Sequence, residues 1–411
     1  MKYFLCLVAL LVSIPAVAAQ NNQQSSDTYV LLVSFDGFRN DFVKHWNLRN
    51  FKRLASEGAS ATSLIPVYPS KTFPNHYTQV TGLYPENHGL IENTFYRETT
   101  DSLYSISDRD AVEDPSYYGG LPLWQYVQQQ GKKSASFFWV GSEAPITGHH
   151  PDYYKTFDPE IPNYDRINQV MEWFSLPAPE RPQFITLYFS FVDSVGHEYG
   201  PDSTEMQDAA MEADRLVGYI LDELEKLPIA VNLIMTSDHG MYPVLDRPPS
   251  YIDLTQFKIS DDEASITSGQ NQAMVYLKNK ADISDLYNRI KPIRGSFTVY
   301  LKEETPAHWH FGEHSNIGDI LIVAELGFII TRSLAERNFS NELIGVHGYD
   351  ARDIGILHGF FYAWGPQIRA GSTLPSFESI HIFPLVTTLL QLPSLPNIDG
   401  ELAITQSILK K

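Results

Sequence analysis

Tyr29-Val-Leu-Leu-Val-Ser-Phe35 is a nearly unbroken apolar run that stops abruptly at an aspartate and a glycine. Such a run is typical of a strand that is buried on both faces of a parallel sheet. Phe184-Ile-Thr-Leu-Tyr-Phe-Ser-Phe-Val192 and Ala230-Val-Asn-Leu-Ile-Met235 have the same character, and segments with helical spacing separate the three runs. The chain is therefore predicted to be an α/β protein with a mostly parallel sheet.

Each of these apolar runs delivers an aspartate at its carboxyl end, and the three are Asp36, Asp193 and Asp238. In open α/β sheets the functional site lies beyond the carboxyl ends of the strands. One aspartate there could simply start a turn or cap a helix, but three at equivalent positions are hard to explain in that way. We therefore expect the three carboxylates to share one crevice.

The pattern changes between residues 243 and 344, where short mixed strands and one helix are expected and no strand ends in an aspartate. The sheet pattern resumes at Gly359-Phe-Phe-Tyr-Ala-Trp364. We therefore predict a catalytic α/β domain of residues 20–242 and 345–411, interrupted by a small inserted α+β cap of residues 243–344.

Residues 1–19 have the pattern of a secretory signal peptide. Lys2 gives a basic start, residues 4–17 are apolar, and Ala16-Val17-Ala18 offers a small-residue cleavage site. The apolar stretch is short and broken by a proline, which favours cleavage over a membrane anchor, so no stable membrane span is expected in the mature chain. The one cysteine, Cys6, lies inside this segment. We expect an exported protein, periplasmic or extracellular, without disulfides or thiolate ligands.

The net charge of the chain is -19. Such a surface repels nucleic acid polymers and anionic membranes, so neither is an expected partner. A phosphate-bearing small molecule would have to meet a local positive centre. Few lysine or arginine residues lie near the aspartates, and metal ions are the natural source of that charge.

Short segments scattered along the chain carry aspartate and histidine residues in patterns suited to metal binding. Asp193 and His197 are four residues apart, so a single helical turn would point their carboxylate and imidazole in the same direction. The candidate ligands are Asp36, Asp193, His197, Asp238, His239 and His347. Oxygen and nitrogen ligands without sulfur suit zinc, and manganese or iron less well.

Thr72 lies in Tyr68-Pro-Ser-Lys-Thr-Phe-Pro-Asn-His-Tyr77, a segment from which a helix is expected to run over His76 to Thr81. The free N–H groups of a helix N-terminus favour a phosphate. A threonine hydroxyl is a poor nucleophile, but a bound metal converts it to an alkoxide near neutral pH. The six candidate ligands and the Thr72 oxygen are enough for two adjacent ions. Such a pair would clamp the attacking and leaving oxygens of a displacement at phosphorus.

Several short motifs occur along the chain in a specific order, although each alone would be a weak signal. They are Ser70-Lys-Thr-Phe-Pro-Asn-His76, Gly82-Leu-Tyr-Pro-Glu-Asn-His-Gly89, Asn93, Asp193-Ser-Val-Gly-His197, Ser237-Asp-His-Gly-Met241 and His347-Gly-Tyr-Asp350. As an ordered set, from Val30 to about Pro366, they resemble the nucleotide pyrophosphatase/phosphodiesterase family of the alkaline phosphatase superfamily. The resemblance implies a three-layer α/β/α sandwich like that of alkaline phosphatase, and type I phosphodiesterase activity.

The resemblance also implies two zinc ions per chain and a role for each motif residue. One zinc would be held by Asp36, Thr72, Asp238 and His239, and the other by Asp193, His197 and His347. Asn93 and the Thr72 backbone N–H would bind the non-bridging phosphoryl oxygen. Thr72 would attack phosphorus, and hydrolysis of the resulting phosphothreonine would complete the reaction.

Aromatic residues point to the kind of substrate. Phe73 follows the nucleophile where related monoesterases place an arginine or lysine, which favours a diester over a monoester. The resemblance places Phe73 and Phe157 against a nucleobase, with Trp139-Val-Gly-Ser-Glu143 beside them. The family usually has tyrosine at the position of Phe157 and Trp-Pro-Gly-Ser-Asp in the adjoining segment, so this chain departs from the pattern there. Without the resemblance, packing in the core explains these aromatics equally well.

The leading hypothesis is a zinc-dependent hydrolase of nucleotide phosphodiester and phosphoanhydride bonds that releases nucleoside 5'-monophosphates. A glycerophosphodiester or lysophospholipid phosphodiesterase is an alternative, and a zinc-bound pseudoenzyme that only binds ligand is another. The sequence leaves the oligomeric state open.

Overall fold

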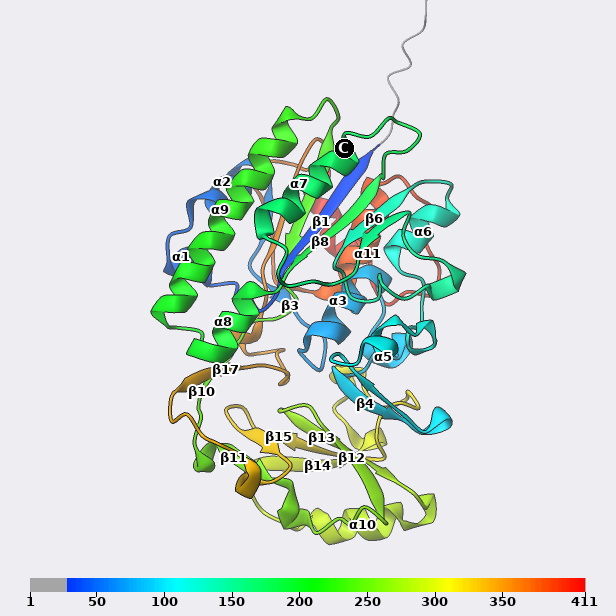
Figure 1. The fold of residues 1–411 in the computed structure, drawn as a ribbon, viewed down its shortest axis with the longest axis vertical. Helices are drawn as coiled ribbons and strands as arrows, with labels where there is room; N and C mark the ends of the chain where they lie inside the picture. The colour runs from blue at the N-terminus through cyan, green and yellow to red at the C-terminus, as the bar shows by residue number, and fades with distance from the viewer. Residues whose placement is uncertain (1–27, 411) are drawn as a thin grey trace, which may run out of the picture.

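The computed structural model describes residues 28–410, so the predicted signal peptide lies outside the described residues. An eight-stranded sheet, here called the central sheet, has the strand order β19-β2-β18-β9-β1-β8-β6-β7 (Figure 1). At its centre β1 (Tyr29–Phe35) pairs in parallel with β8 (Phe184–Phe189) on one side and β9 (Val231–Thr236) on the other. Every residue of these three strands is buried, as the apolar runs predicted.

The outer strands of the central sheet are shorter. They are β2 (Ala59–Ala61), β6 (Ser134–Phe137), β7 (Tyr153–Lys155), β18 (Phe361–Trp364) and β19 (Ser372–Leu374). Only β18 runs against its neighbours, being antiparallel to both β9 and β2. The prediction of a mostly parallel sheet is therefore confirmed.

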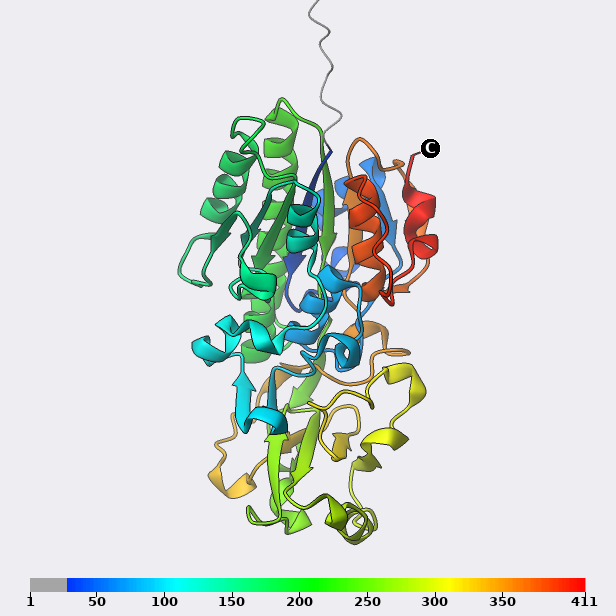
Figure 2. The same ribbon diagram turned by 90° about the vertical axis from the view of Figure 1, so that its right-hand side faces the viewer.

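Helices cover both faces of the central sheet. In Figure 2, α7 (Asn163–Phe174) and α9 (Thr204–Lys226) lie on one side and α11 (Ile382–Leu389) lies on the other. Helix α9 begins where the Ser203 hydroxyl oxygen accepts a hydrogen bond from the Met206 N–H, a standard N-cap. No helix among residues 28–410 is both long and apolar enough to cross a bilayer.

Eight further helices belong to the same part of the described chain. They are α1 (Phe42–His45), α2 (Arg49–Glu57), α3 (Thr72–Thr81), α4 (Pro85–His88), α5 (Arg109–Glu113), α6 (Leu123–Gln129), α8 (Phe191–Tyr199) and α12 (Leu402–Thr405). Three two-stranded ribbons pair β3 (Leu64–Ile65) with β20 (Phe377–Glu378), β4 (Thr94–Arg97) with β5 (Ser102–Ser105), and β11 (Tyr251–Asp253) with β16 (Ile329–Thr331).

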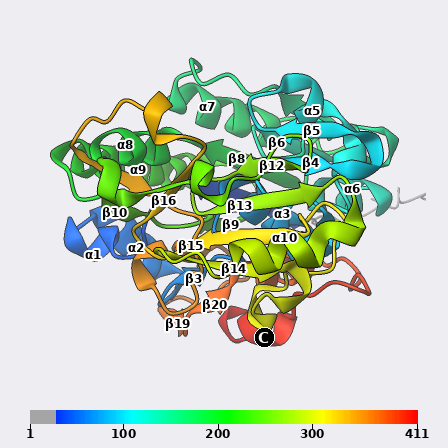
Figure 3. The same cartoon turned by 90° about the horizontal axis from the view of Figure 1, so that it is seen from below.

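A four-stranded antiparallel sheet, here called the lower sheet, lies below the central sheet in Figure 1 and in front of it in Figure 3. Its strands are β12 (Ala264–Ser268), β13 (Gln272–Leu277), β15 (Ile320–Ala324) and β14 (Phe297–Leu301), and it packs with α10 (Ile283–Ile290). This part of the chain has its own cluster of buried apolar side chains.

The chain enters and leaves this part through one antiparallel ribbon, in which β10 (Tyr242–Leu245) pairs with β17 (Leu343–Val346). The strands and the helix expected between residues 243 and 344 are present, but the expectation that no strand here ends in an aspartate is wrong, because β11 ends at Asp253. The division of the chain into two domains at those boundaries stays a prediction.

Two local expectations differ from the structure. The strand beginning at Ser134 was expected to continue to Val140, but β6 ends at Phe137 because Phe138 has a φ of 70°, outside the strand conformation. Asp193 does not follow its strand directly, because it lies in the first turn of α8.

Replacing Leu32 by alanine should lower the free energy of unfolding by about 2–5 kcal/mol, because its fully buried side chain lies in the middle of β1 and would leave a cavity. Urea denaturation measures the change. Leu103→Ala is the matched control, since that side chain is 52% exposed and its loss should change stability by less than about 0.5 kcal/mol. Equal effects of the two substitutions would contradict the central position of β1.

Candidate active site

The three predicted aspartates converge at one edge of the central sheet, because β9, β1 and β8 are neighbours and run in the same direction. Asp36 follows β1, and its neighbour Gly37 donates a backbone hydrogen bond to Asp238 Oδ1 at 3.1 Å. Gly37 has a φ of 67°, and a Cβ atom there would lie 2.9 Å from the Asp193 Cβ. Only glycine therefore allows the two turns to approach so closely.

Asp36, Asp238 and His239 form the first group of candidate ligands, with their ligand atoms within 4.8 Å of one another. His239 Nε2 lies 3.0 Å from Asp238 Oδ2 and 3.5 Å from Asp36 Oδ1. The Thr72 hydroxyl oxygen is 3.4 Å from the same nitrogen. The candidate nucleophile and these three ligands therefore share one small volume.

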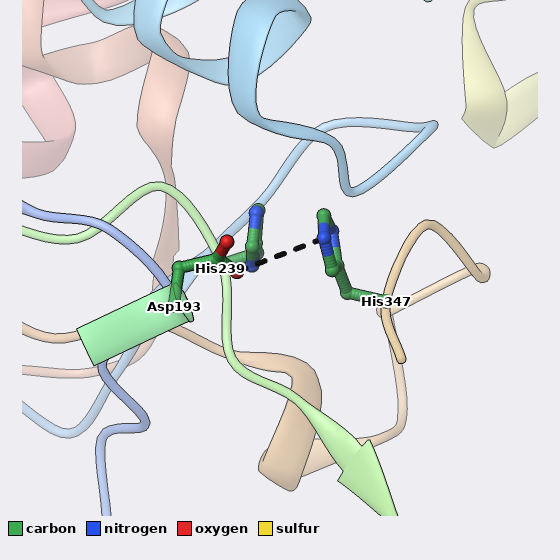
Figure 4. A group of neighbouring side chains, drawn as sticks. All are labelled: Asp193, His239 and His347. Carbon is green, nitrogen blue, oxygen red and sulfur yellow. Dashed lines mark ion pairs between the residues drawn. The ribbon is translucent and has the colours of Figure 1, made fainter. Parts of the chain in front are cut away.

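Asp193, His239 and His347 form a second group with the same 4.8 Å limit. Figure 4 shows the Asp193 carboxylate facing both imidazoles, and its dashed line marks the ion pair between His347 Nε2 and Asp193 Oδ1 at 3.8 Å. His197 Nε2 lies 3.4 Å from Asp193 Oδ1 and 3.1 Å from His347 Nε2. His239 belongs to both groups, so the two groups are adjacent.

Backbone carbonyl groups fix the orientation of all three imidazoles. Nδ1 lies 2.8 Å from the Gly345 oxygen in His197, 2.9 Å from the Gly240 oxygen in His239, and 2.8 Å from the Ser70 oxygen in His347. Because a carbonyl oxygen can only accept, each Nδ1 carries the proton and donates it. Each Nε2 then turns an unprotonated lone pair toward the carboxylates, which is the form that binds a metal.

The charge balance of the cluster fits a cation. Asp36 Oδ1, Asp193 Oδ1 and Asp238 Oδ2 are buried and have no hydrogen-bond partner among the described residues. Burial, followed by the charges of Asp238 and Asp193, raises the pKa of Asp36 well above its usual range. Burial and the Asp193 charge raise the pKa of Asp238 to about 8. Unpaired carboxylate oxygens facing imidazole lone pairs form a donor set for divalent metal ions.

The helix expected over His76 to Thr81 is present as α3, but it begins four residues earlier, with Thr72 as its first residue. The Phe73 N–H donates a hydrogen bond to Asn93 Oδ1 at 3.0 Å. Because the Asn93 oxygen is engaged, its side-chain NH2 group is the end that can donate to a ligand. Asn93 therefore lies beside the helix N-terminus that carries the candidate nucleophile.

A cavity of about 220 Å³ opens next to the ligand cluster, and both Thr72 and Asp193 line it. The three aromatic residues assigned to the substrate, Phe73, Trp139 and Phe157, line the same cavity. Trp139 is almost fully buried and donates its indole N–H to the His76 carbonyl oxygen at 3.0 Å. It forms a fixed wall, whereas Phe157 is 38% exposed.

Three lining residues were not foreseen in these roles. The Tyr188 hydroxyl donates to Asp36 Oδ2 at 2.5 Å, and Arg109 forms an ion pair with Glu143. Glu143 also accepts a hydrogen bond from the Phe157 backbone N–H at 3.2 Å. The sequence drew attention to Glu143, because it departs from the family pattern in the tryptophan motif. It gave no indication of a role for Arg109 or for Tyr188, which lies inside an apolar run.

Known proteins resemble this chain in sequence and in structure. A sequence model of the family described as type I phosphodiesterase / nucleotide pyrophosphatase matches residues 30–350. The venom phosphodiesterase of Macrovipera lebetinus is 34% identical over 92% of this chain and 45% of its own length. An uncharacterised pyrophosphatase/phosphodiesterase of Schizosaccharomyces pombe is 30% identical over 95% of this chain and 83% of its own. The chain spans about half the length of the venom enzymes that it matches.

Solved structures give the same result. Murine ectonucleotide pyrophosphatase/phosphodiesterase 5, in its inactive T72A form and in complex with AMP, superposes with a TM-score of 0.86 at 30% identity. The match covers 93% of this chain and 100% of the murine chain. The human counterpart has the same TM-score and identity.

Replacing Asp238 by asparagine should stabilise the metal-free chain at pH 8 by at least about 1 kcal/mol. The raised pKa of Asp238 means that its ionisation disfavours folding. This destabilisation is absent below the unfolded pKa of about 3.9 and grows as the pH rises toward 8. Thermal unfolding with a chelator at pH 8 and pH 5 measures the difference, which should shrink at the lower pH. Excess zinc should then stabilise the unsubstituted chain far more than Asp238→Asn.

Asp246→Asn is the control, because Asp246 is also buried but its oxygens already accept hydrogen bonds from Tyr251 and Ser340. This substitution should destabilise the chain and leave the zinc-dependent gain intact. A metal-free Asp238→Asn chain less stable than the unsubstituted one at pH 8 would contradict the proposed repulsion.

Proposed function

Because the chain belongs to the type I phosphodiesterase/nucleotide pyrophosphatase family of hydrolases, we propose that it releases nucleoside 5'-monophosphates from nucleotide phosphodiester and phosphoanhydride bonds. One observation carries the proposal. The Thr72 hydroxyl lies 3.4 Å from His239 Nε2, where the two ligand groups meet, and it lines an aromatic cavity. A nucleophile, a charge-stabilising centre and a pocket for a flat apolar group are therefore contiguous.

We propose that two zinc ions complete the site. Asp36, Thr72, Asp238 and His239 would hold one, and Asp193, His197 and His347 would hold the other. The first set contains one of the two groups of ligand atoms, and the contacts of His197 with Asp193 and His347 support the second. When bound, such a pair supplies positive charge to the attacking and leaving oxygens of an in-line displacement.

Thr72 acts as the nucleophile in the proposed reaction. Its hydroxyl oxygen forms a bond to phosphorus, and the bond from phosphorus to the leaving oxygen breaks. The nucleotide is then attached to the chain as a phosphothreonine ester. Water attacks phosphorus in the second step, the bond to the Thr72 oxygen breaks, and the nucleoside monophosphate leaves.

Asn93 and the Thr72 backbone N–H provide the hydrogen-bond donors of the proposed mechanism. Negative charge grows on the non-bridging phosphoryl oxygens in the transition state, and fixed donors stabilise it. The Asn93 NH2 group is available for this role because its Oδ1 atom is held by the Phe73 N–H at 3.0 Å. Loss of one such donor typically costs about 3 kcal/mol of transition-state stabilisation.

The aromatic cavity supports a nucleobase as the recognised group. Phe157 is backed by Phe138 at 5.3 Å between ring centroids, and Phe73 is backed by Tyr104 at 6.3 Å. Glu143 is the cavity carboxylate outside the ligand cluster, and its ion pair with Arg109 leaves it poorly placed to bind a quaternary amine. This pairing disfavours the glycerophosphocholine alternative. The AMP bound by the murine relative agrees with a nucleotide substrate. We also propose export, from the signal pattern of residues 1–19.

Thr72→Ala should reduce kcat for p-nitrophenyl thymidine monophosphate by at least about 10³-fold, because the nucleophilic oxygen is removed. Zinc content, measured by mass spectrometry, should stay above that of a chelated sample because the other ligands remain. Thr81→Ala is the matched control. Thr81 lies on the same helix and is buried, but its hydroxyl donates to the Tyr77 carbonyl oxygen at 2.8 Å. Full turnover by Thr72→Ala would exclude Thr72 as the nucleophile.

Phe157→Ala should lower kcat/KM for nucleotide diesters by about tenfold, because stacking on one base contributes about 1–3 kcal/mol. Glycerophosphocholine has no base, so any turnover of it should change little. The unsubstituted enzyme should prefer p-nitrophenyl thymidine monophosphate to p-nitrophenyl phosphate and to glycerophosphocholine. Turnover of glycerophosphocholine without turnover of nucleotides would exclude the nucleotide assignment in favour of the glycerophosphodiester one.

A further inference from the structure

A buried chain of hydrogen bonds connects the lower sheet to the Asn93 backbone. Gln272, the first residue of β13, donates its side-chain N–H to Glu92 Oε2 at 3.0 Å. The other oxygen of this carboxylate, Oε1, accepts the Asn93 backbone N–H at 2.9 Å. Glu92 is fully buried and Gln272 is 1% exposed. The two side chains are 180 positions apart in sequence, so the fold alone brings them together.

With Glu92 ionised, the hydrogen bonds of this network run in consistent directions. The Tyr68 hydroxyl donates to Gln272 Oε1 at 2.9 Å, which fixes the amide so that its NH2 group faces Glu92. Both Glu92 oxygens then accept, which suits the ionised carboxylate. Burial raises the pKa of Glu92, while the nearby Lys71 charge and the hydrogen bonds from Asn93 and Gln272 oppose that rise. In this arrangement both oxygens of the buried carboxylate accept a hydrogen bond, so the network holds its members in place.

The turn that carries Gln272 packs directly on the active-site segments. A Cβ atom at Gly269 would lie 2.7 Å from the Glu92 carboxyl carbon, so the backbone of the turn touches this side chain. Asn271, in the same turn, donates its side-chain N–H to the carbonyl oxygen of Gly348, the residue after His347. The turn between β12 and β13 therefore contacts both the Asn93 segment and the His347 segment.

Asn93 is consequently held at two points. Its backbone N–H is fixed by Glu92, and its side-chain oxygen is fixed by the Phe73 N–H. Neither contact uses the side-chain NH2 group, which therefore remains able to donate. A donor that stabilises a transition state acts only if its direction is set before the reaction, because reorientation then costs nothing during it.

We propose that Gln272 and Glu92 are positioning residues for the reaction, and that through them the lower sheet aims the Asn93 amide at the phosphoryl group. The inference rests on the proposed function, in which Asn93 contacts a non-bridging oxygen. It assigns a catalytic contribution to a part of the chain that supplies no metal ligand. Neither Gln272 nor Glu92 touches the substrate in this arrangement.

The test is a double-mutant cycle between Gln272→Leu and Asn93→Ala, with p-nitrophenyl thymidine monophosphate as the substrate. Gln272→Leu keeps the size of the side chain and removes both of its hydrogen bonds. It should lower kcat by about tenfold with KM nearly unchanged, because the Asn93 donor acts in the transition state. In the Asn93→Ala background the same substitution should cause no further loss. Zinc content should be equal in all four proteins.

Gln256→Leu is the matched control, because Gln256 is exposed in the same part of the chain and its side chain bonds only the local Asp253 carbonyl oxygen. It should leave kcat and KM unchanged. If Gln272→Leu yields no soluble protein, Tyr68→Phe replaces it. This variant deletes one hydroxyl, and the smaller loss of kcat that it causes should likewise vanish in the Asn93→Ala background.

Each outcome of the double-mutant cycle either supports or overturns the positioning role of Gln272 and Glu92. An undiminished kcat in Gln272→Leu, or a loss of the same size with and without the Asn93 side chain, overturns the inference and shows a structural role only. No turnover by the unsubstituted zinc-loaded enzyme overturns the proposed function, and the inference with it. Turnover by the unsubstituted enzyme together with additive losses overturns the inference alone.

Discussion

Three carboxylates, two of them buried, repel one another at the edge of the central sheet. Asp36, Asp193 and Asp238 each have an oxygen without a hydrogen-bond partner among the described residues, and the neighbouring imidazoles present lone pairs rather than protons. Like charges held close together at a buried site destabilise the fold unless an opposite charge compensates them. The fold must therefore hold the ligands rigidly while they repel one another. Three adjacent parallel strands do so, because their carboxyl ends meet at one edge.

The sequence allowed this edge to be predicted because its determinants are local. Apolar runs define β1, β8 and β9, and an aspartate after or near each run marks the carboxyl end. The four-residue spacing of Asp193 and His197 predicted that one helical turn holds both, and α8 confirms it. The helix that runs to Thr81 was predictable for the same reason. Patterns within ten residues carry information about direction and burial, which is what these features need.

Features that depend on distant partners were not predictable. Tyr188 bonds Asp36 across 152 positions, and Gln272 bonds Glu92 across 180, and neither side chain has a local signature. The early end of β6 depends on the positive φ of Phe138, whose ring packs against Phe157 at 5.3 Å. The role of the lower sheet was likewise hidden, because its strands contain none of the metal-binding residue types at recognisable spacing. Contacts between residues that are far apart in sequence, rather than local preference, determine the two hydrogen bonds, the end of β6 and the position of the lower sheet.

In the proposed reaction the central sheet positions the metal ligands and the lower sheet positions a hydrogen-bond donor. Cations at the edge of the central sheet would attract any phosphate, since their field has no preferred orientation about the phosphorus atom. Selection among phosphates needs directional donors and a shaped wall, and both must be rigid to act in the transition state. The aromatic cavity supplies the wall, with Trp139 fixed by the His76 carbonyl oxygen. In the proposed mechanism the Asn93 amide supplies direction, and its backbone N–H donates to a carboxylate that accepts a hydrogen bond from the lower sheet. Because the entry and exit strands of that sheet's segment pair as β10 and β17, just after His239 and just before His347, a shift of the lower sheet would move donors and ligands together.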